Sequence, residues 1–181
     1  MKTAIKTIII TGTPCTGKTT ISKKLSEVLN FLYLDINQIL RKYKIKYSYD
    51  KKRRCKVIDT KKLNKSLIEE LNNAKNYNKS TINPNKTKNT NKINGVIIDS
   101  HLSHYLPKKY VDLCIVAKCS LKILEKRLIK RGYSKKKIRE NLDAEIFDVC
   151  HVESVERKHK VLIVDTSNKI NYGNLIRVMN L

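Results

Sequence analysis

Residues 12–19, with the sequence GTPCTGKT, fit the pattern G-x-x-x-x-G-K-[ST] at every position. Glycines in such a loop let backbone N–H groups point at phosphate oxygens, and the following helix adds the partial positive charge of its N-terminus. Lys18 is placed to reach the β- and γ-phosphates of a nucleoside triphosphate, and the Thr19 hydroxyl to bind Mg²⁺. The motif therefore predicts a P-loop that binds ATP with Mg²⁺.

A P-loop enzyme also needs a carboxylate near the metal ion, normally at the end of a neighbouring strand. Asp99 closes the apolar run GVIID and is the best candidate for the Mg²⁺ and water shell. Asp165 closes a similar run, but the last strand of such a fold is expected to face the adenine side. Asp35 ends another short run, on the side where an acceptor would bind.

His101 follows Asp99 by two residues, and His104 comes three residues later. A histidine at the first position can orient a water molecule or contact the transferring phosphate. The alternative, a ring that only satisfies loop backbone, stays open for His101 and is stronger for His104. A metal site built from these three side chains is disfavoured, because a phosphate site is adjacent and no further strong ligand is near.

Residues 126–139 carry eight basic side chains and no acidic one. Phosphoryl transfer places charge on the γ-phosphoryl oxygens, and planar guanidinium groups stabilise that charge. Arg127 and Arg131 are four residues apart, at the end of an expected helix. This density of positive charge favours a mobile segment that faces an anion, with a basic surface patch as the alternative.

The elements that must position these residues can be read from short apolar runs. Strands alternating with amphipathic helices predict an α/β fold, a P-loop NTPase with a five-stranded parallel sheet flanked by helices. The carboxyl ends of parallel strands share one edge, where ligands bind. Strands are expected at 6–11, 31–34, 95–99, 112–117 and 160–165, and helices at 18–30, from 59 or 60 onward, at 120–131, at 134–157 and at the end of the chain.

Two polar segments interrupt this alternation. Residues 41–56 are basic and include three tyrosines. Residues 72–94 are dominated by Asn and Lys without an apolar period, so we expect a disordered or mobile loop that lies away from the active site.

The composition fits one domain of 181 residues, with a formal net charge of +23. Such a charge attracts polyanions, namely nucleotides, RNA or acidic proteins, although a lysine-rich surface shaped by genome composition explains it equally well. Five cysteines without a C-x-x-C pair suit reduced thiols. With no signal-peptide pattern and no long apolar stretch, we expect no membrane partner and a cytoplasmic protein, or a nuclear one in a eukaryote.

Three stretches together resemble the adenylate kinase isoenzyme 6 family: residues 12–20 (GTPCTGKTT), 98–104 (IDSHLSH) and 127–147 (RLIKRGYSKKKIRENLDAEIF). The resemblance covers nearly the whole chain outside 72–94. It implies an ATP:AMP phosphotransferase with ATPase activity and a role in small-ribosomal-subunit maturation. The implied partners are a small-subunit ribosomal protein of the uS11 family and rRNA.

The family pattern also implies roles for single residues. Arg131 would face ATP from a lid near 130–140 and act in catalysis with Lys18, Asp99 and His101. The acceptor would bind a segment at about 35–59, with Arg41 on its phosphate and with Asp35 and Arg127 as further substrate-binding residues. The resemblance further implies that the phosphates of ATP are contacted by Cys15, Gly17, Lys18, Thr19 and Thr20.

Two functions remain open: a nucleoside monophosphate kinase, and a ribosome-assembly ATPase that binds a ribosomal protein or rRNA. Only the kinase needs an arginine on the acceptor phosphate. A pure nucleic-acid-binding module is disfavoured because no RNA-binding motif is recognisable. Cys15 departs from the family, because glycine is common there; a small side chain is acceptable provided that its φ is not strongly positive. A thiol at this position would also make the enzyme sensitive to oxidation.

Overall fold

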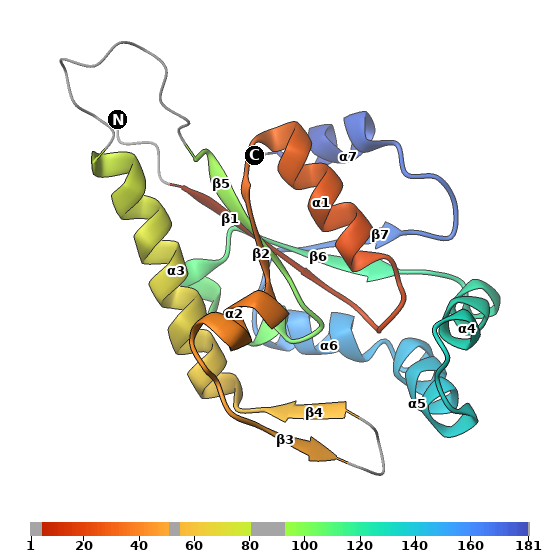
Figure 1. The fold of residues 1–181 in the computed structure, drawn as a ribbon. Helices are drawn as coiled ribbons and strands as arrows, with labels where there is room; N and C mark the ends of the chain where they lie inside the picture. Colours follow the sequence, from red (N-terminus) through yellow and green to blue (C-terminus); the bar gives the residue numbers. More distant parts are fainter. Residues whose placement is uncertain (1–4, 51–54, 81–92, 181) are drawn as a thin grey trace.

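The computed structural model describes residues 5–50, 55–80 and 93–180, and it is built around one parallel sheet (Figure 1). The five strands lie in the order β2-β5-β1-β6-β7, which confirms the predicted fold class. Their bounds are Lys6–Thr11 for β1, Leu32–Asp35 for β2, Gly95–Asp99 for β5, Leu113–Lys118 for β6 and Val161–Asp165 for β7.

The central strand β1 is apolar because both of its faces are covered. It pairs in parallel with β5 on one side and with β6 on the other, so that Ile9 lies between Ile98 and Cys114. The register also brings carboxylates together at the carboxyl edge, because Asp99 is level with Asp35 of β2. The P-loop leaves the end of β1 at this same edge.

Helices cover both faces of the sheet (Figure 1). On one face, α1 (Lys18–Leu29) and α7 (Tyr172–Met179) pack their apolar sides against β1, β5 and β6. On the other face lie α2 (Ile36–Lys42), α3 (Thr60–Ser80) and α6 (Val149–Glu156). This three-layer arrangement buries the sheet and leaves the carboxyl edge for ligands.

Two smaller units border the carboxyl edge. The helices α4 (Leu121–Lys130) and α5 (Lys135–Ile146) share a cluster of their own, with Leu124 and Leu128 fully buried. The strands β3 (Tyr47–Asp50) and β4 (Cys55–Ile58) form an antiparallel hairpin. Two 3₁₀ turns, η1 (Ser103–Tyr105) and η2 (Lys108–Tyr110), follow β5.

The predicted disordered loop at 72–94 is wrong for its first part, because α3 continues to Ser80. Ala74 extends the buried face of Leu67 and Leu71, which keeps the helix against the core despite its polar sequence. Residues 81–92 lie outside the described residues, so the rest of that prediction is untested.

The single helix predicted at 134–157 is also wrong. It is two helices, since α5 ends at Ile146 and α6 begins at Val149. Asp148 adopts the left-handed conformation with φ of 53°, which breaks the helical path between them. Helix α2 and the β3–β4 hairpin were not predicted. In the part of the chain that the structure describes, no helix is both long and apolar enough to cross a bilayer.

Candidate active site

The P-loop joins β1 to α1, and two of its glycines are required by the backbone. Gly12 has φ of 138°, and a Cβ there would lie 2.3 Å from the carbonyl oxygen of Ala117. Gly17 has φ of 91° and precedes the first turn of α1. Both positions therefore disfavour residues with a side chain. Because α1 begins directly after Gly17, its N-terminus lies at the end of the loop.

The Lys18 side chain lies within the loop. Its Nζ donates a hydrogen bond of 2.8 Å to the carbonyl oxygen of Thr13, which also accepts from the Thr16 hydroxyl at 2.8 Å. Burial, the largest effect, lowers the pKa of Lys18 against the opposing influence of Cys150 and Asp99. The ammonium group is thus already positioned where the motif requires a cation.

Cys15 does not meet the condition under which a side chain would be accepted at this position, namely a φ that is not strongly positive. Its φ is 71°, in the left-handed region that favours glycine. The Sγ atom accepts a long hydrogen bond of 3.9 Å from Nη1 of Arg131. The backbone at this position is therefore strained, and the thiol lies beside the predicted lid arginine.

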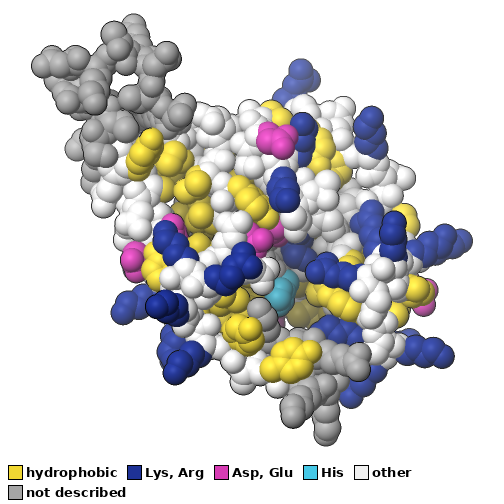
Figure 2. All heavy atoms as spheres, in the orientation of Figure 1, with side chains coloured by type: hydrophobic (Ala, Val, Ile, Leu, Met, Phe, Trp, Pro, Cys, Tyr) yellow, Lys and Arg dark blue, Asp and Glu magenta, His cyan; other side chains and the backbone are white. Residues whose placement is uncertain are grey.

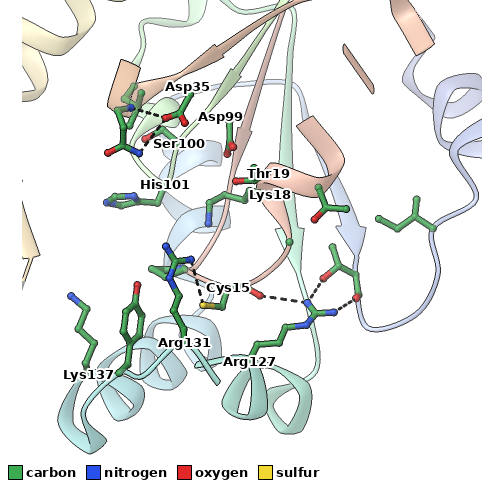
Figure 3. Close-up of a pocket in the computed structure, with 18 of the residues that line it drawn as sticks. Cys15, Lys18, Thr19, Asp35, Asp99, Ser100, His101, Arg127, Arg131 and Lys137 are labelled. Atoms are coloured by element: carbon green, nitrogen blue, oxygen red, sulfur yellow. Dashed lines mark hydrogen bonds between the residues drawn. The ribbon is translucent and has the colours of Figure 1, made fainter. Parts of the chain in front are cut away.

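These groups border one large cavity of about 1060 Å³ at the carboxyl edge. Figure 3 shows Lys18 and Arg131 pointing toward one another across it, with Thr19, Asp99 and His101 on the side of the sheet. In Figure 2, Lys and Arg side chains surround a hollow in which a histidine lies. The cavity thus has the positive lining that a polyphosphate needs.

Asp99 is buried, and its Oδ2 accepts a hydrogen bond of 3.0 Å from the hydroxyl of Tyr33. Burial first, and then the charge of Asp99, raises the pKa of Tyr33, so the hydroxyl remains a donor. Thr19 lines the same cavity. A carboxylate and a hydroxyl are hard oxygen donors of the kind that Mg²⁺ takes, with phosphates and water completing its shell, so these residues fit the ion.

The two histidines have different environments. The ring of His101 lines the cavity, and partial desolvation there, followed by the charge of Lys18, lowers its pKa to about 4. His104 is turned away and buried; its Nδ1 lies 2.8 Å from the Thr11 hydroxyl and its Nε2 lies 2.6 Å from Oε2 of Glu153. Only His101 therefore faces the site, as a neutral imidazole.

Arg127 lines the cavity, but its guanidinium is engaged by the protein. It donates to the carbonyl oxygen of Thr166 at 2.8 Å, to the Thr166 hydroxyl at 3.1 Å and to the carbonyl oxygen of Cys15 at 3.5 Å. The Thr166 hydroxyl donates in turn to the carbonyl oxygen of Thr16 at 2.6 Å. Arg127 thus braces the P-loop against the segment after β7, whereas Arg131 is exposed in the cavity.

Asp35 and Arg41, two of the residues predicted to bind the acceptor, border a second cavity that adjoins the main one. Asp35 lines the main cavity and caps α2, because its Oδ1 accepts from the backbone N–H of Asn37 at 2.7 Å. Arg41 does not line that cavity. It borders a second cavity of about 690 Å³ with Lys44 and Lys46, and the two cavities share Asp35 and Asn37.

Sequence reasoning missed several residues that the fold brings to the site. Tyr33 comes from an edge strand, and Glu145 of α5 accepts a hydrogen bond from the Thr13 hydroxyl. Thr20, for which a contact with ATP phosphates was predicted, lines the cavity. The last strand was expected to face the adenine side, but no residue of the segment after β7 was named; the residues of that segment that line the cavity are Thr166, Asn168, Lys169, Ile170 and Tyr172.

Comparison with known proteins agrees with this geometry. The AAA domain family matches residues 8–148. A "Putative adenylate kinase" of Methanocaldococcus jannaschii is 41% identical over 162 residues, covering 90% of this chain and 77% of that protein. The "Adenylate kinase isoenzyme 6 homolog" of Caenorhabditis elegans is 28% identical, covering 82% of this chain and 72% of its own length.

Two solved structures are similar in fold. Deoxyadenosine kinase of M. mycoides with bound dATP superimposes with a TM-score of 0.53 at 16% identity, covering 97% of this chain and 100% of that one. Shikimate kinase of Acinetobacter baumannii with shikimate gives 0.52 at 13% identity, covering 98% and 92%. At this identity the likeness concerns the architecture alone.

Proposed function

This chain belongs to the adenylate kinase isoenzyme 6 family of AAA-domain P-loop proteins, and from that premise we propose that it transfers the γ-phosphoryl group of ATP to AMP, giving two ADP. The observation that carries the proposal is the pair of cations, Lys18 and Arg131, that point at each other across the main cavity (Figure 3). A phosphoryl group between them would be neutralised from both sides.

The reaction needs no nucleophile from the protein. An oxygen of the AMP phosphate attacks the γ-phosphorus, and the bond from that phosphorus to the β–γ bridging oxygen breaks. Lys18 and Arg131 stabilise the charge that develops on the phosphoryl oxygens. Mg²⁺, which Thr19 and Asp99 would hold together with the nucleotide, supplies further charge neutralisation. Cys15, Gly17 and Thr20 would complete the phosphate contacts at the N-terminus of α1.

The acceptor would occupy the region where the two cavities meet. Asp35 and Asn37 border both, and Arg41 with Lys44 and Lys46 gives the second cavity a positive wall. A monophosphate there would be held by charge within the 35–59 segment. The turn and helix at 130–140 would act as the lid that excludes water during transfer.

One observation favours a second function, an ATPase that acts in small-subunit assembly with a uS11-family protein or rRNA. His101 faces the cavity with a pKa of about 4, so its neutral ring can accept a hydrogen bond from an attacking water molecule. In that case γ-phosphate would pass to water, and no acceptor site would be needed.

The test is ADP formation from ATP and Mg²⁺ with and without AMP, with Lys18→Ala as the blank. A kinase shows a large AMP-dependent rise that Lys18→Ala abolishes. In the otherwise wild-type protein Arg41→Ala raises the KM for AMP, while Arg177→Ala, an exposed change on α7, leaves it unchanged. A slow rate that is indifferent to AMP, but is raised by a uS11-family protein, would replace the kinase with the assembly ATPase.

A further inference from the structure

Glu145 is a buried carboxylate on the last turn of α5, with an exposed fraction of only 8%. Its Oε2 accepts a hydrogen bond of 2.5 Å from the Thr13 hydroxyl, and its Oε1 accepts one of 3.2 Å from the backbone N–H of Cys119. Among the ion pairs of the described residues, none involves Glu145. Burying a carboxylate without a cation is costly, so these two hydrogen bonds are what stabilises it there.

The partner residue is the centre of the P-loop's internal contacts. The Thr13 carbonyl oxygen accepts from Lys18 Nζ and from both the hydroxyl and the backbone N–H of Thr16. The Thr13 side chain is 2% exposed and has Glu145 as its acceptor. The Glu145 carboxylate is therefore hydrogen-bonded to the residue whose carbonyl oxygen accepts the hydrogen bond from Lys18 Nζ.

The other end of the same helix faces the nucleotide cavity. Lys137, in the first turn of α5, lines the cavity, and its Nζ lies 5.7 Å from the centre of the Tyr133 ring (Figure 3). Arg131 lies 5.7 Å from the centre of the same ring, in the turn before the helix. Lys137 and Glu145 are separated by about 12 Å along the helix axis. Helix α5 thus connects the basic segment proposed as the lid to the P-loop.

We propose that Glu145 is a positioning residue that fixes the P-loop through Thr13 and anchors α5 so that its basic end is aligned with the phosphates of ATP. When ATP binds, its phosphate oxygens replace the Thr13 carbonyl oxygen as the partner of Lys18 Nζ. The hydrogen bond from the Thr13 hydroxyl to Glu145 then keeps the loop in its conformation. The inference rests on the proposed function for the identity of the ligand, but it concerns binding of ATP and needs no acceptor.

The test is the affinity for a fluorescent ATP analogue with Mg²⁺, measured without AMP. Glu145→Gln keeps the shape but cannot accept from both partners, and Thr13→Val removes the hydroxyl from a residue of nearly equal volume. Each weakens binding about 10-fold or more, as expected for a hydrogen bond to a buried charge. Thr13→Ser restores affinity, and Asp143→Asn, which breaks only a surface pair with Arg139 on the same helix, leaves it unchanged.

A double variant distinguishes a specific role of Glu145 in positioning the P-loop from a general loss of stability. Because both variants break the same contact, Thr13→Val with Glu145→Gln binds no more weakly than either alone. In turnover assays the KM for ATP rises while the KM for AMP stays constant. Native ATP affinity in folded Glu145→Gln, or losses that add in the double variant, would overturn the proposal. If Glu145→Gln does not fold, Thr13→Val and Thr13→Ser decide alone. A chain that binds ATP normally but never uses AMP would refute only the kinase function.

Discussion

The hydroxyl of Tyr33 on β2 donates to Oδ2 of Asp99 on β5 over 3.0 Å, so an edge strand orients the carboxylate that closes its neighbour. Groups that hold a metal-binding carboxylate from outside typically change metal affinity or activity 10–100-fold when removed. With Asp99 in its proposed role as an Mg²⁺ ligand, the contact would link the conformation of β2 to the metal requirement of the site.

Replacing Tyr33 with Phe therefore raises the Mg²⁺ concentration needed for half-maximal activity by about 10-fold. Tyr43→Phe is the matched control, because its hydroxyl bonds to Glu70 away from both the P-loop and Asp99. The measurement is a Mg²⁺ titration of ADP formation at saturating ATP. An unchanged midpoint in Tyr33→Phe would contradict an influence of this hydroxyl on metal binding by Asp99.

Cys15→Gly stabilises the protein. A side chain at φ of 71° stores backbone strain that glycine does not, and relief of that strain exceeds the entropy that glycine costs in the unfolded chain. We expect a net gain of about 1 kcal/mol in the free energy of unfolding. Cys15→Ala retains a Cβ and should show no such gain. Denaturant unfolding of the three proteins measures this, and equal stability would show that the loop is relaxed.

ATP protects Cys15 from thiol reagents. Cys114 and Cys119 are buried and Cys150 is half-buried, and burial raises the pKa of all three thiols, that of Cys114 to about 11, so their thiolates are scarce. Cys15 lines the cavity and is half-buried. In a Cys55→Ser background, mass spectrometry should show Cys15 labelled first and shielded by ATP with Mg²⁺. Labelling at the same rate with and without ATP would place the phosphates elsewhere.

Stability falls as the pH is lowered from about 6.5 toward 4, the range between the ordinary pKa of histidine and that of His101. Burial, the largest effect, lowers the pKa of His104 and His159 as well, so the unfolded chain binds protons in this range that the folded chain does not. The free energy of unfolding is therefore smaller at pH 5 than at pH 7.5.

His159→Gln makes the difference in the free energy of unfolding between pH 7.5 and pH 5 smaller, because glutamine can still donate to the carbonyl oxygen of His104 but does not titrate. The lowered pKa values of Glu70 and Asp148 stabilise the folded chain almost equally at pH 5 and pH 7.5, because that stabilisation is lost only as the pH falls below the ordinary pKa of these carboxyls, so they contribute little to the difference. Denaturant unfolding at the two pH values is the measurement. Identical stabilities of the wild type at both values would contradict the lowered pKa values of these rings in the folded protein.

The local sequence was sufficient for the five strands of the parallel sheet and for the P-loop, because each is specified by consecutive residues, whereas the β3–β4 hairpin was not predicted. Buried parallel strands require unbroken apolar runs, and the loop requires glycine at fixed positions. The break at Asp148 and the extension of α3 through Ala74 depend on which face meets the core, and no local signal marks them.

The site shows the same division. Lys18, Thr19, Asp99, His101 and Arg131 all line one cavity, as their motifs indicated. Glu145 was part of a quoted motif, but its contact with Thr13 spans 132 positions of the chain and follows only from packing. Arg127 has the right type and spacing for a substrate contact, yet its partners are backbone and hydroxyl oxygens of the protein.

The strand order has a consequence for how this protein is made. Among the described residues, β1 pairs with β5 and β6, and β2 pairs with β5 alone, so the first two strands of the main sheet have no sheet partner in the first 94 residues. During synthesis they must wait until Gly95–Asp99 emerges and inserts between them. The nucleotide loop lies near the start of the chain, but its supporting sheet is completed only when the second half has been translated.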